Sequence, residues 1–349
     1  MPGITIIGTG RHVPGRPIKN DELSRVMETS DEWIRPRSGI EQRHFVSEGE
    51  GVSDMAAIAA EKALADANVA KEEVDYVIFG TMTPEHVFPG SGALLGAKLG
   101  IPGVPALDIR QQCAAMPFGL QLADGLVASG AARTVLLIGA EAHAGFMPWD
   151  WEVLADDTGE KKPSPEQYEF ASKHRGTAVL FGDGAGALVL RKSDRDGHGL
   201  LAAATHSDGR AMDQIWIPGG MFTRRHYWTA SVDSHIPTMK GKELFKSAVT
   251  LLPKVVREVC AKAGVTLEQI DWFVAHQAND RINASVRDSL KIPPEKVPSN
   301  IARYGNTSAG TIPILLDELI RDGKVQKGQL ICFLALGAGL NWGAAVMRI

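Results

Sequence analysis

Helix-like and strand-like stretches alternate along the first half of the chain. The segment MAAIAAEKALADA (55–67) has the small and apolar residues of a packed helix, which Ser53 or Asp54 could cap and Asn68 could end. A continuous apolar strand follows at 74–81, and a second one at 132–142 comes after an amphipathic helix. Helices that alternate with continuously apolar strands predict an α/β protein whose sheet is covered on both faces.

A weak internal repeat relates the two halves of the chain. When each residue is set beside the residue 196 positions later, Asp75 meets Asp271 and Pro117 meets Pro313. In the same register ARTVLLIG (132–139) lies over GQLICFLA (328–335). Self-similarity kept over this distance predicts two copies of one α/β unit.

The repeat also suggests where the chain divides. We expect an N-terminal half at 1–190 and a C-terminal half at 191–349, because charged and irregular sequence within 191–235 interrupts the pattern. Pro253 lies in an otherwise helical stretch and predicts a kink or a break there.

The composition excludes several classes of protein. The 349 residues are 44% hydrophobic and 22% charged, and the net charge of −4 gives no general attraction to nucleic acid or to an anionic membrane. No apolar run is long enough to span a bilayer, and MPGITIIGTG reads as a first strand rather than a signal peptide. The three cysteines form no metal-binding motif, so we expect a reducing, cytoplasmic setting and no metal.

Cys113 is the first candidate for chemistry. It follows a short strand, ALDI, and precedes the amphipathic stretch AAMPFGLQLADG, which places the thiol over a helix N-terminus. The positive end of a helix dipole stabilises a thiolate, so Cys113 is a candidate nucleophile. A buried small hydrophobe is the alternative, and it is the better interpretation for Cys260 and Cys332, which lie inside a helix and a strand.

His276 and Asn306 are the second and third candidates. His276 stands at the end of the apolar run DWFVA, beside polar residues, where it could act as an acid or base or have only a structural role. Asn306 precedes another apolar helix, and the repeat makes Ala309 the counterpart of Cys113. The two junctions would therefore meet, although a turn or cap is the simpler explanation of Asn306 alone.

Two glycine-rich stretches are less specific. GDGAG (182–186) lacks the Lys-Ser/Thr of a phosphate loop, and with AVLF before it and ALVL after it we expect a tight turn between strands. LGAGLNWG (336–343) follows a strand, so its backbone N–H groups could approach an oxyanion or its glycines could serve close packing.

Together, short segments spread over nearly the whole chain are more specific than any one of them: TSDEWI (29–34), RSGIEQRH (37–44), TPEHVFPG (83–90), the Cys113 helix, RGTAVLFGDGAGA (175–187), AHQAND (275–280), YGNTSAG (304–310) and GAGLNWG (337–343). In these segments the chain resembles β-ketoacyl-acyl-carrier-protein synthase III and its relatives in the thiolase superfamily. The resemblance implies an α/β thiolase fold, with a duplicated, five-layered αβαβα architecture, and a homodimer.

The resemblance also implies a reaction. Cys113 would accept an acyl group from acyl-CoA, and His276 and Asn306 would stabilise the enolate left when a malonyl thioester, on acyl carrier protein, loses CO₂. The carbanion would attack the Cys113 thioester, with the backbone N–H groups of Cys113 and Ala338 as the oxyanion hole. No cofactor is expected beyond coenzyme A as part of the substrate.

Binding positions follow from the same resemblance. Trp33 and Arg37 would flank the CoA adenine, and Phe88 would reach the acyl pocket, often across the dimer. Other positions would line the CoA tunnel, and a basic patch would receive the carrier protein: Arg175, Phe245, Asn279 and Arg281 for the tunnel, and Lys246, Arg281 and Arg287 for the patch. Ordinary solvated surface is the alternative for each of these charged residues.

The chain differs from its relatives in ways that narrow the function. LGAGLNWG lacks the second catalytic cysteine of thiolases, Asn306 stands where elongating synthases have a second histidine, and no carboxylate motif of hydroxymethylglutaryl-CoA synthases is present. Ala115 and Met116 follow the nucleophile where the family usually has a glycine, and the segment 146–174, with Trp149 and Trp151, is longer than usual. We therefore expect a primer longer or less usual than acetyl, with the tryptophans lining an enlarged pocket or covering the dimer interface.

Other functions share part of this pattern. An acyltransferase of the same fold, moving the acyl group to a hydroxyl or amine without forming a C–C bond, would keep Cys113. A catalytically silent partner subunit usually lacks the cysteine. A papain-type Cys-His-Asn hydrolase matches the residue types but neither the duplicated pattern nor the chain order.

Overall fold

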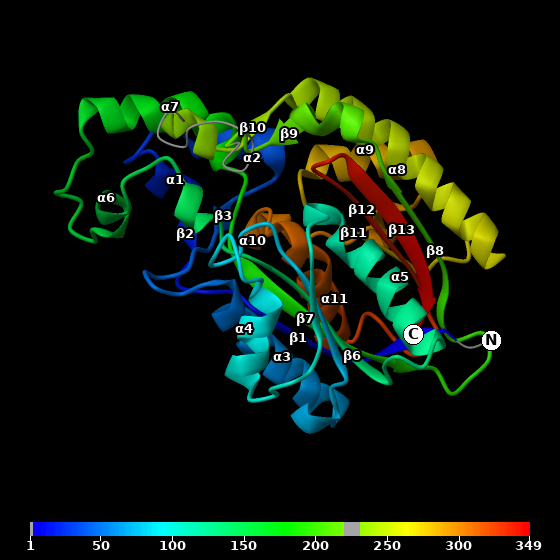
Figure 1. Cartoon of the computed structure of the whole chain (residues 1–349). Helices are drawn as coiled ribbons and strands as arrows, with labels where there is room; N and C mark the ends of the chain where they lie inside the picture. Colours follow the sequence, from blue (N-terminus) through cyan, green and yellow to red (C-terminus); the bar gives the residue numbers. More distant parts are fainter. Residues whose placement is uncertain (1–2, 220–230) are drawn as a thin grey trace.

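The computed structural model describes residues 3–219 and 231–349. Two curved sheets lie face to face with helices between them and on their outer sides (Figure 1). A smaller lobe of short helices and strands lies beyond one end of the sheets. Part of the predicted dividing segment, at 220–230, lies outside the described residues.

The first sheet is five-stranded, in the order β1-β7-β6-β4-β5. Its strands β4 and β6, and β4 and β5, pair in parallel, whereas β1 and β6 both pair antiparallel with β7. The strands are β1 (Ile4–His12), β4 (Tyr76–Gly80), β5 (Ala106–Ile109), β6 (Thr134–Glu141) and β7 (Gly184–Lys192). Strand β5 forms one edge of this sheet.

The second sheet is four-stranded, in the order β11-β12-β13-β8. Here β11 and β12 are parallel and the other pairs antiparallel, which repeats the pairing of the first sheet without a counterpart of β5. The strands are β8 (Gly199–Ser207), β11 (Trp272–Ala275), β12 (Leu330–Gly337) and β13 (Asn341–Arg348). The predicted boundary after residue 190 remains a prediction, and β7 runs past it to Lys192.

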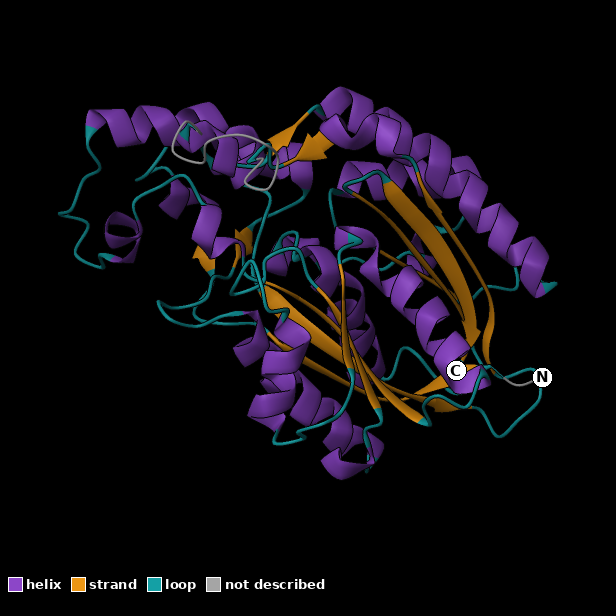
Figure 2. Cartoon of the chain, viewed as in Figure 1, coloured by secondary structure: helices purple, strands orange, loops and turns teal. Residues whose placement is uncertain are grey.

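The helices complete five layers (Figure 2). Helix α3 packs on the outer face of the first sheet with α4 beside it, α8 packs on the outer face of the second with α9 beside it, and α5 and α11 lie between the sheets. The helices are α3 (Val52–Ala67), α4 (Ser91–Leu99), α5 (Ala115–Ala128), α8 (Gly241–Ala263), α9 (Asp280–Leu290) and α11 (Thr311–Arg321). This confirms the predicted αβαβα arrangement.

The register of the repeat is confirmed for four pairs of elements. Adding 196 to the first residues of β4, α5 and β6 gives the first residues of β11, α11 and β12. Adding it to the short turn η2 (Gln112–Ala114) gives η8 (Ser308–Gly310). The turns match in detail, since Gln112 has φ 48° and Ser308 has φ 47°, both left-handed. The nucleophile's turn and its counterpart are thus the same local structure built twice.

Short elements form the outer lobe and the remaining connections. The lobe contains β2 (Ile18–Lys19), α1 (Asn20–Leu23), α2 (Asp31–Ser38), β3 (Gln42–Arg43), α6 (Trp151–Ala155) and α7 (Pro165–Ala178). The connections contain η1 (Lys71–Glu73), η3 (His143–Phe146), η4 (Gly209–Gln214), β9 (Ile215–Trp216), η6 (Val232–His235), β10 (Thr238–Met239), η7 (Pro294–Lys296) and α10 (Ile301–Tyr304). Within the described residues, no helix is both long enough and apolar enough to span a bilayer.

Three local predictions need correction. Gly51, not Ser53 or Asp54, is the N-cap of α3, although the Asp54 carboxylate accepts from the Gly51 N–H, and Asn68 ends the helix as predicted. Pro253 does not break α8, which runs through it.

GDGAG is not a turn between two strands, because α7 precedes it and its last three residues begin β7. The apolar run before it is short and buried, and such a run does not distinguish a strand from the end of a helix. Its glycines serve close packing instead. A Cβ at Gly186 would lie 2.7 Å from the Pro313 side chain on α11.

Candidate active site

One large cavity, of about 540 Å³, brings the three candidate catalytic residues together. Cys113 comes from the first half, and His276 and Asn306 come from the second half. Apolar side chains make most of the remaining wall, among them Leu180, Phe181, Ile215, Met239, Leu244, Phe245, Leu252, Ile282, Leu334 and Leu336. The shape suits a long, mostly apolar arm that brings its reactive end to Cys113.

Cys113 sits in the η2 turn, directly before α5, as predicted. Its Sγ lies 3.4 Å from the Ser308 hydroxyl oxygen. Burial raises the pKa of the Cys113 thiol to about 12, the Ser308 hydrogen bond acts against that rise, and the Glu141 carboxylate adds to it. The expected thiolate is therefore not the resting form of the free protein, because removal from water outweighs the favourable end of the helix.

His276 is buried and neutral. Burial lowers the pKa of His276 to about 3. Its Nδ1 lies 2.7 Å from the Thr311 hydroxyl, which itself donates to the Ser308 carbonyl at 3.0 Å. Since that hydroxyl proton is used, Nδ1 carries the imidazole hydrogen and donates to Thr311. Within the described residues Nε2 has no partner, so it is free to accept a proton.

The backbone around Asn306 fixes the orientation of its amide. The Asn306 N–H donates to the Leu180 carbonyl and its carbonyl accepts from the Gly182 N–H. The side-chain Oδ1 accepts from the Ser308 N–H at 2.8 Å. Oδ1 is thereby occupied, which leaves the Nδ2 amine as the group that can donate to a molecule in the cavity.

Gly337, the last residue of β12, lines the cavity and lies against the backbone of Cys113. A Cβ built on Gly337 would lie 3.0 Å from the Cys113 nitrogen and 3.1 Å from the Ala114 nitrogen. Ala338, the next residue, lines the cavity. The structure therefore brings together the two backbone segments that were predicted to form an oxyanion hole.

The chain is similar to known proteins along nearly all of its length. Family models match at residues 37–145 (thiolase, N-terminal domain), 166–209 (3-oxoacyl-[acyl-carrier-protein (ACP)] synthase III) and 260–349 (the C-terminal part of the same synthase). A β-ketoacyl-[acyl-carrier-protein] synthase III from Rhodospirillum centenum is 40% identical over 346 residues, covering 98% of both chains. The chain belongs to the 3-oxoacyl-[acyl-carrier-protein] synthase III family.

Solved structures of the family have the same fold as this chain. The synthase III from Aquifex aeolicus is 39% identical, with a TM-score of 0.85 over 99% of this chain and all of its own. The priming β-ketosynthase of the R1128 polyketide pathway is 28% identical, with a TM-score of 0.86 over all of this chain and 96% of its own. The predicted thiolase fold is therefore confirmed.

The binding residues that the family implies fall into three groups. Four of them line the cavity: Phe245, Asn279, Arg281 and Ala338. Trp33 lies apart, with the Arg37 and Arg175 guanidinium groups each 4.8 Å from the centre of its ring. The Asn279 amide donates to the Arg37 carbonyl at 2.8 Å, which ties this aromatic stack to the cavity wall.

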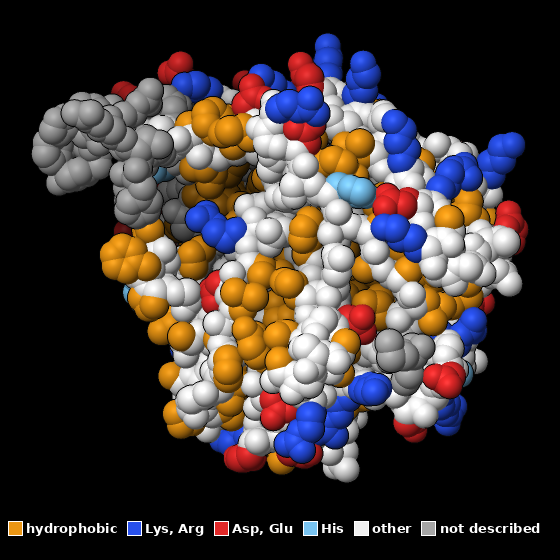
Figure 3. All heavy atoms as spheres, turned by 45° about the vertical axis from the view of Figure 1, so that its right-hand side comes forward, with side chains coloured by type: hydrophobic (Ala, Val, Ile, Leu, Met, Phe, Trp, Pro, Cys, Tyr) orange, Lys and Arg blue, Asp and Glu red, His pale blue; other side chains and the backbone are white. Residues whose placement is uncertain are grey.

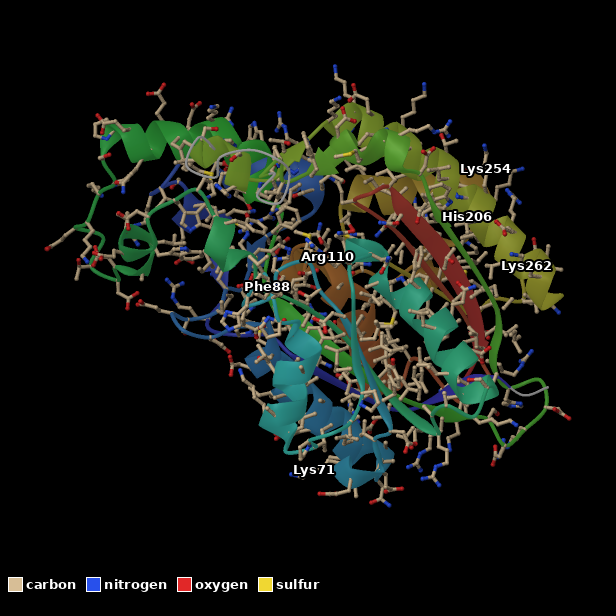
Figure 4. All side chains as sticks on the ribbon, in the orientation of Figure 1. Lys71, Phe88, Arg110, His206, Lys254 and Lys262 are labelled. Carbon is tan, nitrogen blue, oxygen red and sulfur yellow. The ribbon has the colours of Figure 1, made fainter. Side chains whose placement is uncertain are left out.

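Three other predicted residues do not line the main cavity. Phe88 is 78% exposed on the loop between β4 and α4 (Figure 4). Lys246 lies on α8, away from the wall. Arg287 pairs with the adjacent Asp288 carboxylate at 2.8 Å, which reduces its value as a free cation for docking.

The lengthened segment does not enlarge the cavity. Trp149 and Trp151 pack against Phe45 and each other, with ring centroids 5.0–5.7 Å apart. Trp149 is 6% exposed, in the apolar core of the outer lobe. The prediction that these tryptophans line the pocket is wrong, because their indole rings pack edge-to-face against each other and against Phe45 inside the lobe. Ala115 and Met116 are likewise buried in the core between the sheets.

Sequence reasoning missed several residues at the site. Lys242 lines the cavity and is exposed, so it stands with Arg281 at the open end. Ser308, Thr311 and Glu141 contact catalytic side chains or each other. The repeat could have found Ser308, since it is the counterpart of Gln112 in the nucleophile's turn.

Proposed function

We propose that this protein catalyses a decarboxylative condensation. An acyl group moves from acyl-CoA to Cys113, and malonyl-acyl carrier protein then extends it to a β-ketoacyl thioester. The observation that carries the proposal is the convergence of Cys113, His276 and Asn306 on one apolar cavity. The enzyme is thus a condensing transferase. Nothing in the site favours transfer to a hydroxyl or an amine.

The first half-reaction uses the unpartnered Nε2 of His276 as a proton acceptor. The Cys113 proton passes to His276 Nε2, which is the unpartnered acceptor. The thiolate attacks the thioester carbonyl while the N–H groups of Cys113 and Ala338 hold the developing oxyanion. Coenzyme A leaves as the thiol after it takes the proton. No cofactor takes part in this scheme beyond the coenzyme A carried by the substrate.

The second half-reaction needs hydrogen-bond donors. Loss of CO₂ leaves an enolate oxygen, to which Asn306 Nδ2 donates. His276 Nε2 donates as well once it takes a proton from solvent and Nδ1 gives its own proton up to solvent, after which the Thr311 hydroxyl turns and donates to Nδ1. The carbanion attacks the carbonyl carbon of the Cys113 thioester, a C–C bond forms, the C–S bond breaks and the Cys113 thiolate leaves.

The substrate arms are assigned by position. We propose that CoA lays its adenine at the Trp33, Arg37 and Arg175 stack and runs its pantetheine arm past Phe245 and Asn279. Arg281 and Lys246 would meet the acidic carrier protein, with a lesser part for Arg287. The three cysteines are all free, which supports a reducing, cytoplasmic compartment.

We further propose that the protein is a homodimer. Strand β5 forms one edge of its sheet, and Leu107 on it is 40% exposed. Phe88 and Val87 are 78% and 62% exposed nearby in the chain, and Figure 3 shows hydrophobic side chains gathered across one face of the molecule. Such an edge and such side chains suit pairing with a second copy. Leu107→Glu should give monomers in sedimentation experiments, and a wild-type protein that is monomeric would contradict the proposal.

The decisive experiment is intact-protein mass spectrometry after incubation with acyl-CoAs from acetyl to dodecanoyl. A mass gain that is absent in Cys113→Ala identifies the nucleophile and ranks the primers. We expect chains longer than acetyl to load best, and loading of acetyl alone would refute that part. Malonyl-acyl carrier protein added to the loaded enzyme should release CO₂ and give a β-keto product. An acyl ester or amide without CO₂ would instead identify an acyltransferase.

A further inference from the structure

Ser308 contacts the side chains of Cys113 and Asn306 directly, and it contacts His276 through Thr311. Its N–H holds the Asn306 amide, and its carbonyl holds the Thr311 hydroxyl that orients His276. Its own hydroxyl lies 3.4 Å from the Cys113 sulfur. Its left-handed backbone, at φ 47°, is costly for a residue with a side chain and persists only where the surroundings impose it.

On its other side the Ser308 hydroxyl meets a buried carboxylate. Glu141, at the end of β6, has no exposed surface. Its Oε1 accepts from the Ser308 hydroxyl at 3.0 Å. Its Oε2 accepts four hydrogen bonds, from the hydroxyls of Thr81 and Thr83 and from the N–H groups of Met82 and Thr83, at 2.6–3.2 Å. Oε2 is thus held by four donors, whereas Oε1 accepts its hydrogen bond from Ser308.

A serine hydroxyl has one proton, and this sets the direction of the chain of hydrogen bonds. Since a carboxylate only accepts, Ser308 gives its proton to Glu141 and offers the sulfur a lone pair. The Cys113 thiol then donates to Ser308. Sulfur, hydroxyl and carboxylate form one relay, in which the Glu141 carboxylate favours the protonated sulfur because it holds the Ser308 proton away from it.

We propose that Glu141 and Ser308 are positioning residues: Glu141 keeps the Cys113 sulfur protonated in the free enzyme by holding the Ser308 proton, and the Ser308 hydroxyl turns to the sulfur when the thiol proton leaves. The S–H bond breaks as an N–H bond forms at His276 Nε2. The Ser308 O–H bond only rotates. The proposal rests on the proposed function, in which Cys113 takes the acyl group.

Several charged or titratable groups line the same cavity as this sulfur or lie one hydrogen-bonded residue away from it. Glu141 adds to the raised pKa of Cys113, and the Ser308 hydrogen bond opposes it. His276 shares the cavity wall and is neutral, because burial lowers its pKa to about 3. Lys242 and Arg281 are exposed at the open end of the same cavity. Of these groups, only Glu141 is joined to the sulfur through a hydrogen-bonded partner.

Two substitutions should move the reactivity of Cys113 in opposite directions. In Glu141→Gln the amide oxygen satisfies the four donors and the amide nitrogen donates to Ser308, which frees the Ser308 proton for the sulfur and removes a negative charge. We expect iodoacetamide to alkylate Cys113 about tenfold faster at pH 8, a shift of about one pKa unit. Ser308→Ala removes the hydroxyl donor, so alkylation should become several-fold slower.

The measurement is the pH profile of alkylation, read on the Cys113 peptide by mass spectrometry, with Cys113→Ala to confirm the site. Thr81→Val is the matched control, because it removes one 3.1 Å contact to the far oxygen of Glu141 and leaves the charge and the Ser308 contact in place. Its profile should stay within about twofold of wild type. Thermal melts establish that each variant is folded.

The outcomes separate this proposal from the proposed function. A profile in Glu141→Gln that is unchanged or slower, or one that Thr81→Val reproduces, overturns the relay. Alkylation needs no acyl donor, so opposite shifts in the two variants support the relay even if no acyl-CoA loads Cys113. Loading by acyl-CoA with unshifted profiles would leave the function intact and the relay refuted.

Discussion

Gly337 sits where β12 meets the nucleophile's turn, so Gly337→Ala tests how finely that turn is placed. The added methyl would lie 3.0 Å from the Cys113 nitrogen and 3.1 Å from both the Ala114 nitrogen and the Gln111 carbonyl oxygen, where ordinary contact begins at 3.4 Å. The turn must therefore withdraw by a few tenths of an ångström. Since a misplacement of about 1 Å can cost roughly a hundredfold in rate, we expect acylation to slow by about three- to tenfold.

The assay is single-turnover loading of acyl-CoA, followed by mass spectrometry, together with a thermal melt. Overpacking of this kind should cost about 1 kcal/mol of stability. Gly125→Ala on α5 is the matched control, because nothing lies within 4 Å of its added methyl. It should load at the wild-type rate and gain a few tenths of a kcal/mol or more. Wild-type loading by Gly337→Ala would refute the idea that this contact sets the position of Cys113.

Three further predictions follow from the site. His276→Ala and Asn306→Ala should keep most acylation and lose decarboxylation of malonyl-acyl carrier protein, measured as released CO₂, and normal condensation by Asn306→Ala would contradict its assigned role. Because burial lowers the pKa of His276 to about 3, the unfolded chain binds a proton below about pH 6.5 that the folded protein refuses. Stability should therefore fall by up to about 1.4 kcal/mol per pH unit between about 6.5 and 3, and His276→Gln should flatten this slope in urea titrations at pH 7 and 5. Lys246→Glu should raise the KM for the carrier protein without slowing acyl-CoA loading, whereas Arg287→Glu should have a smaller effect because Asp288 already pairs with Arg287.

Much of the framework was predictable because it depends on periodic patterns. The 196-residue register located two pairs of strands, one pair of helices and the paired turns of the two halves, and it placed Cys113 and Asn306 on junctions that line one cavity. What the pattern could not give depends on side chains far apart in sequence. Glu141 and Ser308 are 167 positions apart, and neither alone suggests chemistry.

The errors have a similar physical origin. The helix end above Cys113 predicted a thiolate, yet burial by both halves of the chain decides its protonation. Trp149 and Trp151 looked like pocket residues because their partner, Phe45, lies more than 100 positions earlier.

The paired turns at Gln112 and Ser308 mean that neither half of the chain contains the whole active site. The nucleophile comes from one half, whereas its proton acceptor, its hydrogen-bonding hydroxyl and the glycine beneath it come from the other. Activity therefore requires that the two halves are packed together. A chain whose halves were folded but not packed together would have Cys113 but no complete active site. Such a chain would lack His276, Asn306 and Ser308 beside the Cys113 sulfur, so it could not carry out the condensation.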